Sequence, residues 1–70
     1  MKTLKELKNA VQENIPLVWN DPDPIKSNDY TITFVEDIYE EEFDDYTPIH
    51  IHYNGGVSGA LVYLHEIQYK

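Results

Sequence analysis

Histidine is the residue type of this 70-residue chain best suited to chemistry, and two of its three copies are His50 and His52, in the run Ile-His-Ile-His-Tyr. Side chains two residues apart on a β-strand lie on one face, so two imidazoles at this spacing can bind one metal ion. Zinc sites usually have three or four protein ligands. A three-residue turn would place His50 opposite Ala60, and the position of His65 depends on the turn type. His50 and His52 are therefore candidate metal ligands without an assured third ligand, and the alternative is a pair of exposed strand histidines.

Carboxylates form the second reactive group, and they gather between residues 36 and 46, where seven of eleven residues are acidic. Like charges so close together repel, and we expect a solvated, mobile loop or a frayed strand end. The aromatic residues between the acids are what a purely solvating linker would lack, and aromatic side chains are enriched at binding hot spots. The predicted partner-binding residues are Glu36, Asp37, Tyr39, Glu40, Glu41, Glu42, Phe43, Asp44, Asp45 and Tyr46.

The charge balance excludes one class of partner and favours another. Five lysines and no arginine stand against 13 acidic residues, a formal charge of -8, so direct binding to nucleic acid is not expected. Clustered carboxylates can instead imitate the charges of a nucleic-acid backbone and occupy the basic site of a nucleic-acid-binding protein. The alternative is that the acidic run only keeps the protein in solution.

The overall composition, with its small size, strong acidity, six tyrosines and no cysteine, resembles that of phage-encoded inhibitors of restriction, CRISPR or DNA-repair proteins. This resemblance concerns the composition of the whole chain and assigns no role to any residue. It implies an inhibitor that acts by binding a protein.

Enzymatic activity is not expected. Ser27 and Ser58 lie in predicted turns without a nucleophile-elbow pattern, and the clustered carboxylates lie where nothing excludes water. Gly55-Gly56 is too short for a phosphate-binding loop, and the Asp-Pro repeat at residues 21–24 lacks the ligand spacing of a calcium loop. We therefore predict a binding module that needs no cofactor.

The same composition suggests a cytoplasmic protein that does not bind membranes. Without cysteine the chain has neither disulfides nor thiolate metal ligands. No apolar run approaches the roughly 20 residues that span a bilayer, and the first residues lack the apolar stretch of a secretory signal.

The N-terminal residues predict a helix over about residues 3–14. Thr3-Leu4-Lys5-Glu6 is a capping-box pattern, and Leu4, Leu7 and Val11 recur at helical spacing. Pro16 biases the residue before it away from helical geometry and ends the element. Residues 17–19 (Leu-Val-Trp) form an apolar patch, either a brief edge strand or a lid over the core.

Three strands are predicted after this patch, at about residues 29–38, 47–54 and 57–68. In the first, Tyr30, Ile32 and Phe34 alternate with threonines and share one face. A loop at about 36–46 joins the first two strands, and Asn54-Gly55-Gly56 is a tight-turn signal between the last two.

These elements predict a single α+β domain over residues 1–70, an N-terminal helix packed on a three- or four-stranded antiparallel meander. The last strand is apolar on both faces, whereas one helix covers only one face of a sheet. Either a homodimer or the segment around Trp19 would cover the other face. The functional prediction is a small acidic protein-binding module; the alternatives are a self-assembling structural protein and a histidine-based metal-binding module.

Overall fold

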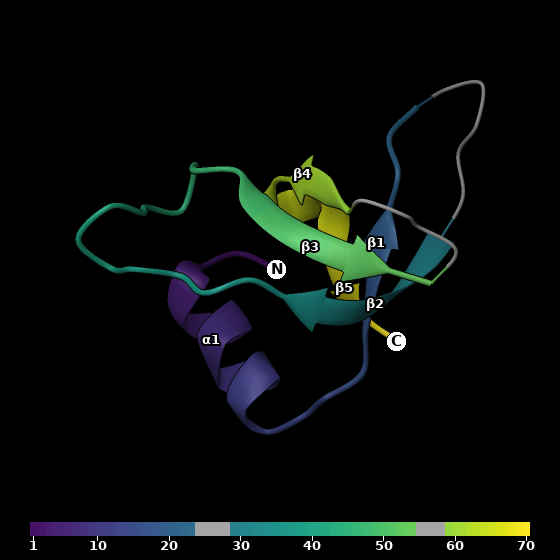
Figure 1. Ribbon diagram of the computed structural model, residues 1–70, viewed down its shortest axis with the longest axis horizontal. Coiled ribbons are helices and arrows are strands. Elements are labelled where there is room, and N and C mark those ends of the chain that lie inside the picture. The colour runs from purple at the N-terminus through teal and green to yellow at the C-terminus, as the bar shows by residue number, and fades with distance from the viewer. Residues whose placement is uncertain (24–28, 55–58) are drawn as a thin grey trace.

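The computed structural model describes residues 1–23, 29–54 and 59–70, and in this part of the chain one helix and five antiparallel strands form the fold. In order, the elements are α1 (Leu4–Gln12), β1 (Leu17–Asn20), β2 (Asp29–Val35), β3 (Ile49–Tyr53), β4 (Ala60–Val62), the 3₁₀ helix η1 (Leu64–Glu66) and β5 (Ile67–Tyr69). The strands pair in the order β4-β3-β2-β1-β5 (Figure 1). The first four form a meander, and β5 returns to pair with β1. The predicted α+β class is confirmed, with five strands rather than three or four.

Local signals set both ends of α1. At its start, Thr3 Oγ1 accepts a hydrogen bond from the backbone N–H of Glu6 over 3.2 Å. At its end, Asn14 has a positive φ of 56°, and Ile15 N–H donates to the carbonyl of Ala10 over 2.9 Å. This is a Schellman termination, in which a residue in the left-handed conformation closes the last turn. None of the described helices has the length and apolar character needed to cross a membrane.

The single strand predicted at about 57–68 is wrong. Within the described residues of that range, β4 ends at Val62, η1 turns the chain, and β5 pairs with β1, where Ile67 lies opposite Trp19. Val62, Leu64 and Ile67 are all buried, although strict strand alternation would place Ile67 on the other face. Residues 55–58 lie outside the described part of the chain, and with them most of the predicted Asn54-Gly55-Gly56 turn.

The segment predicted as an edge strand or a lid is β1, and it lies between β2 and β5 inside the sheet. Its residues Leu17 and Trp19 are buried. The indole ring of Trp19 packs against Tyr30 and Tyr53, with ring centroids 5.5 and 5.2 Å apart. Trp19 is therefore part of the core, and its aromatic neighbours come from β2 and β3.

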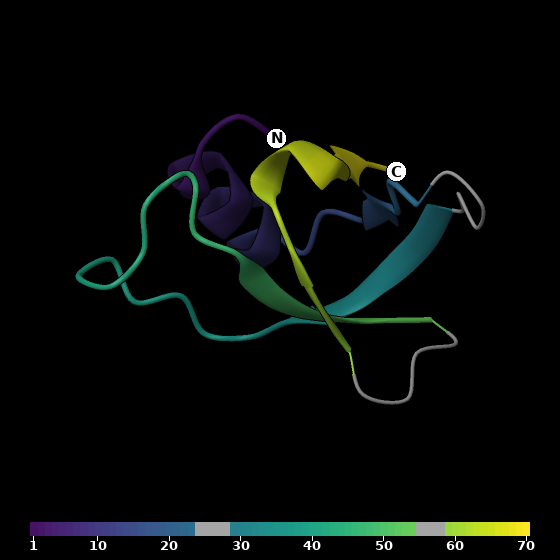
Figure 2. The same cartoon turned by 90° about the horizontal axis from the view of Figure 1, so that it is seen from above.

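The core lies between the concave face of the curled sheet and the helix. Figure 2 shows α1 and η1 on the same side of β2 and β3. From α1 the core receives Leu4, Leu7 and Ala10, while Val11, which was predicted to belong to the apolar stripe, is 39% exposed. The buried hydrophobic residues are Leu4, Leu7, Ala10, Leu17, Trp19, Ile49, Ile51, Val62, Leu64 and Ile67.

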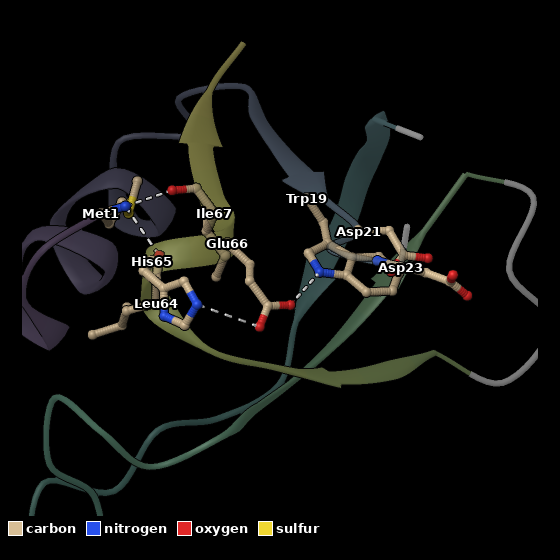
Figure 3. A network of polar contacts seen from close by, with 8 residues as sticks. All are labelled: Met1, Trp19, Asp21, Asp23, Leu64, His65, Glu66 and Ile67. Atoms are coloured by element: carbon tan, nitrogen blue, oxygen red, sulfur yellow. Dashed lines mark hydrogen bonds and ion pairs between the residues drawn. The ribbon is translucent and has the colours of Figure 1, made fainter. Parts of the chain in front are cut away.

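A buried carboxylate links η1 to the aromatic part of the core (Figure 3). Glu66 Oε1 accepts a hydrogen bond from Trp19 Nε1 over 2.9 Å, and its other oxygen lies 3.9 Å from Nε2 of His65. The amino group of Met1 donates to the carbonyl of Leu64 over 3.0 Å and also to that of Ile67. These bonds connect η1 to β1 and to the segment before α1.

Candidate functional site

A β-bulge in β2 determines which side chains lie on the outer face of the sheet, the face away from α1. Ile32 pairs with Tyr53 of β3, but two residues later Phe34 pairs with His52, so β2 carries one extra residue at Thr33. After the bulge Val35 packs against the core, while Phe34 is 57% exposed. The prediction that Phe34 shares a face with Ile32 is therefore wrong.

The same bulge places Glu36 on the outer face. Its backbone N–H donates to the carbonyl of His50 over 3.0 Å, so Glu36 continues the pairing with β3 just beyond the end of β2. Because Val35 points inward, the side chain of Glu36 points outward. Without the extra residue, Glu36 would lie on the same face of β2 as Ile32, and its side chain would point toward the core.

Glu36 lies between the two predicted metal ligands. Its Oε2 is 2.8 Å from His50 Nδ1, and its Oε1 is 3.1 Å from His52 Nε2. The two imidazole rings lie on one face of β3, with centroids 5.3 Å apart, while the alternating residues Ile49 and Ile51 are buried. The hydrogen bonds with His52 and His50 lower the pKa of Glu36 below its ordinary value, so the carboxylate is ionised at neutral pH.

The third group beside the histidine pair is thus a carboxylate and not His65. His65 lies in η1, where its side chain is 78% exposed and its ring stacks on Tyr63 at 5.9 Å. In the neighbouring strand β4, Leu61 pairs with His50 and Ala60 pairs with Ile51. The predicted pairing of His50 with Ala60 is therefore wrong by one residue. Sequence reasoning assigned Glu36 to the acidic loop and therefore missed its contact with the histidines.

The acidic loop, residues 36–46, is bonded to α1 at two points. Lys8 Nζ lies 2.9 Å from Glu40 Oε1, and this ion pair lowers the pKa of Glu40. Asp45 Oδ1 accepts the backbone N–H of Leu4 over 2.8 Å, and an acidic group in this position also interacts favourably with the positive end of the helix dipole. Two acids that were predicted to bind a partner therefore hold the loop against the helix.

Asp44 organises the end of the loop. Its carboxylate accepts the backbone N–H of Tyr46 over 2.8 Å and the hydroxyl of Thr47 over 2.9 Å. These bonds, the one from Tyr46 first, lower the pKa of Asp44. The turn before β3 is thus held by an acidic side chain, as is common where aspartate bonds to the backbone two residues on.

The other three acids of the loop face solvent. Asp37, Glu41 and Glu42 are exposed, and their side chains make no hydrogen bond or ion pair with any residue that the structure describes. Tyr39 and Tyr46 are 56% and 85% exposed. In Figure 1 the loop projects from the body of the sheet beside α1.

Phe43, by contrast, is partly buried and packs against the core. A shallow groove of about 430 Å³ lies between α1 and the first residues of the loop. Its walls are formed by Lys8, Val11, Gln12, Val35, Glu36, Asp37, Ile38 and Tyr39. The groove thus combines the apolar side chains of Val11, Val35 and Ile38 with two carboxylates of the loop.

Comparison of the chain with protein-family models, with curated proteins and with solved structures found no match.

Proposed function

We propose that the acidic loop binds a basic surface of a partner protein. The observation that carries this proposal is that some acids of the loop bond to α1 while others are exposed to solvent. Glu40 and Asp45 are bonded to α1, whereas Asp37, Glu41 and Glu42 are exposed and have no hydrogen bond or ion pair to any residue in the described part of the chain. A loop held in place before it meets its partner loses less conformational entropy on binding than a free linker does.

Two further features support protein binding. Tyr39 and Tyr46 offer exposed aromatic surface beside the free carboxylates, and tyrosine is enriched among residues that dominate binding energy. The groove beside Tyr39 is lined by both apolar and acidic side chains. Lysine and arginine bury their aliphatic stems on apolar surface while their charged ends remain hydrated, so the groove suits such a side chain.

In the specific form of this proposal the partner is a cytoplasmic nucleic-acid-binding protein, and the loop competes with nucleic acid for its basic site. The formal charge of -8 would accelerate the encounter with a positive groove and make it sensitive to salt. No covalent chemistry is needed, because the protein would act by occupying the site. Added DNA or RNA should then displace it.

A pair of matched variants tests the proposal. Glu41→Gln with Glu42→Gln removes two charges from the loop, and Glu6→Gln with Glu13→Gln removes two charges from α1 and its C-cap. The partner is first captured from a lysate of the source organism or its host at low salt, identified by mass spectrometry and purified.

The association rates of the wild type and of the two double variants with the purified partner are then measured. We expect the loop variant to associate several-fold more slowly than the wild type, with a weaker salt dependence, and the helix variant to change less. Equal effects of both variants would show that the loop contributes only through the net charge of the protein and is not the binding surface. Binding that nucleic acid does not displace would contradict the mimicry of nucleic acid.

A further inference from the structure

A second cluster of side chains, separate from the free carboxylates of the acidic loop, lies on the outer face of β2 and β3. One ligand atom from each of Glu36, His50 and His52 lies within 4.8 Å of the other two. The two contacts of the Glu36 oxygens with the imidazole nitrogens measure 2.8 and 3.1 Å. Three potential metal ligands therefore already lie close together.

These spacings are close to those of ligands that share a metal ion. Zinc binds nitrogen and carboxylate oxygen over about 2.0–2.2 Å, and at a tetrahedral angle two such ligand atoms lie about 3.3 Å apart. The two imidazole nitrogens contact different oxygens of Glu36, over 2.8 and 3.1 Å, and the three ligand atoms lie within 4.8 Å of one another. Rotation of these side chains toward a common point would complete the ligand set.

We infer that Glu36, His50 and His52 form a binding site for one divalent first-row transition-metal ion, of which Zn²⁺ is the simplest example. Two imidazole nitrogens and one carboxylate are a donor set that zinc and other late first-row ions accept. Calcium and magnesium prefer oxygen ligands throughout, so the site discriminates against them.

One backbone feature supports the assignment, because it determines where a ligand lies. The bulge at Thr33 turns Glu36 to the histidine face, and bulges are frequent next to functional sites, where they re-aim a side chain. Gly59 has a positive φ of 77°, and a Cβ there would overlap the carbonyl oxygen of Ile51 and lie 3.0 Å from His50 Nε2. The backbone of β3 therefore already requires glycine at this position, with or without an ion.

The surroundings of the site suit an ion that enters from solvent. The side chains of His50, His52 and Glu36 are 36%, 40% and 45% exposed. The ring of Phe34 lies 5.6 Å from that of His52 and restricts its movement on one side. With three protein ligands and this exposure, the bound ion retains at least one position for water or an external ligand.

Isothermal titration of the full chain with Zn²⁺, after treatment with a chelator, tests the inference. We expect one ion per chain, and a rise in Tm of about 10 °C or more at a hundredfold excess over Kd. Mg²⁺ at the same concentration should neither bind measurably nor raise Tm. A stoichiometry well below one, or a Tm that does not respond to Zn²⁺, would overturn the site.

Variants identify the ligands, and His65 supplies a matched control. His52→Ala and Glu36→Gln should each weaken Zn²⁺ binding at least about tenfold, since loss of even an outer partner of a metal site costs that much. His65→Ala removes the third, exposed histidine and should leave Kd unchanged. Equal weakening by all three variants would contradict the assignment.

A spectroscopic readout on the unaltered protein covers the case in which a variant does not fold. Zn²⁺ should shift the imidazole ¹⁵N resonances of His50 and His52 together and leave those of His65 in place. A shift of His65 alone, or of none of the three, would show that the ion does not bind at this cluster.

Discussion

Trp19 donates its indole N–H to the carboxylate of Glu66 over 2.9 Å, and both side chains are buried although one belongs to β1 and the other to η1. A buried donor left without an acceptor costs about 1–3 kcal/mol. We therefore expect Glu66→Ala to lower the free energy of unfolding by about that amount, and Glu66→Gln, which retains an oxygen acceptor, to lower it less. Urea denaturation followed by far-UV circular dichroism measures both. Equal stability of the two variants would show that this bond contributes little.

Because the bulge turns Phe34 outward, we expect its replacement to cost little stability. Replacing a buried phenylalanine with alanine costs about 3–5 kcal/mol. Because Phe34 is 57% exposed, we expect Phe34→Ala to cost less than about 1 kcal/mol. Ile51→Ala, in the neighbouring strand and fully buried, should cost about 2–5 kcal/mol. A loss at Phe34 as large as that at Ile51 would contradict the outward orientation of its side chain.

Sequence reasoning predicted those features of the fold that depend on near neighbours in the chain. The pattern at Thr3 and Glu6 predicted the start of α1, and the threonine cap is present. The alternation around His50 and His52 predicted that both side chains share one face of β3, as they do. The α+β class follows from one amphipathic helix and several strands, which local periodicity is sufficient to recognise.

Features set by distant pairing were not predictable in this way. Alternation along β2 predicts the face on which each side chain lies only while the register between β2 and β3 is constant. The shift of that register at Thr33 depends on the pairing with β3. The turn after Val62 likewise depends on β1, whose edge would otherwise present unpaired backbone groups that Ile67–Tyr69 now satisfy. The position of Glu36 beside the histidines follows from the bulge, and local periodicity therefore could not reveal it.

The bond between Asp45 and the first turn of α1 predicts that the acidic loop and the helix stabilise each other. Removing a side chain that caps a helix start costs about 1 kcal/mol. Asp45→Ala should therefore lower the free energy of unfolding by about 1 kcal/mol, measured by urea denaturation. Asp37→Asn is the control, because the exposed Asp37 has no hydrogen bond or ion pair to a described residue, and it should change stability by less than about 0.5 kcal/mol. If the two variants are equally stable, Asp45 does not fasten the loop to α1.

The contacts of Glu36 predict how stability depends on pH. In the folded protein the hydrogen bonds with His52 and His50 hold the pKa of Glu36 below its ordinary value of 4.5. The unfolded chain therefore binds more protons than the folded one as the pH falls through this range. The stabilisation from Glu36 is complete above pH 4.5 and is lost as the pH falls through the lowered pKa.

Denaturation with urea between pH 7 and pH 3 tests this sign. We expect the free energy of unfolding of the wild type to decline below pH 4.5, and that of Glu36→Gln to decline less steeply over the same interval. Glu41→Gln is the matched control, because Glu41 lies in the same loop without a hydrogen bond or ion pair to a described residue. Its profile should run parallel to that of the wild type. Parallel profiles for all three proteins would mean that the histidines do not stabilise the ionised form of Glu36, and the close contacts of the cluster would then lack an energetic consequence in the metal-free protein.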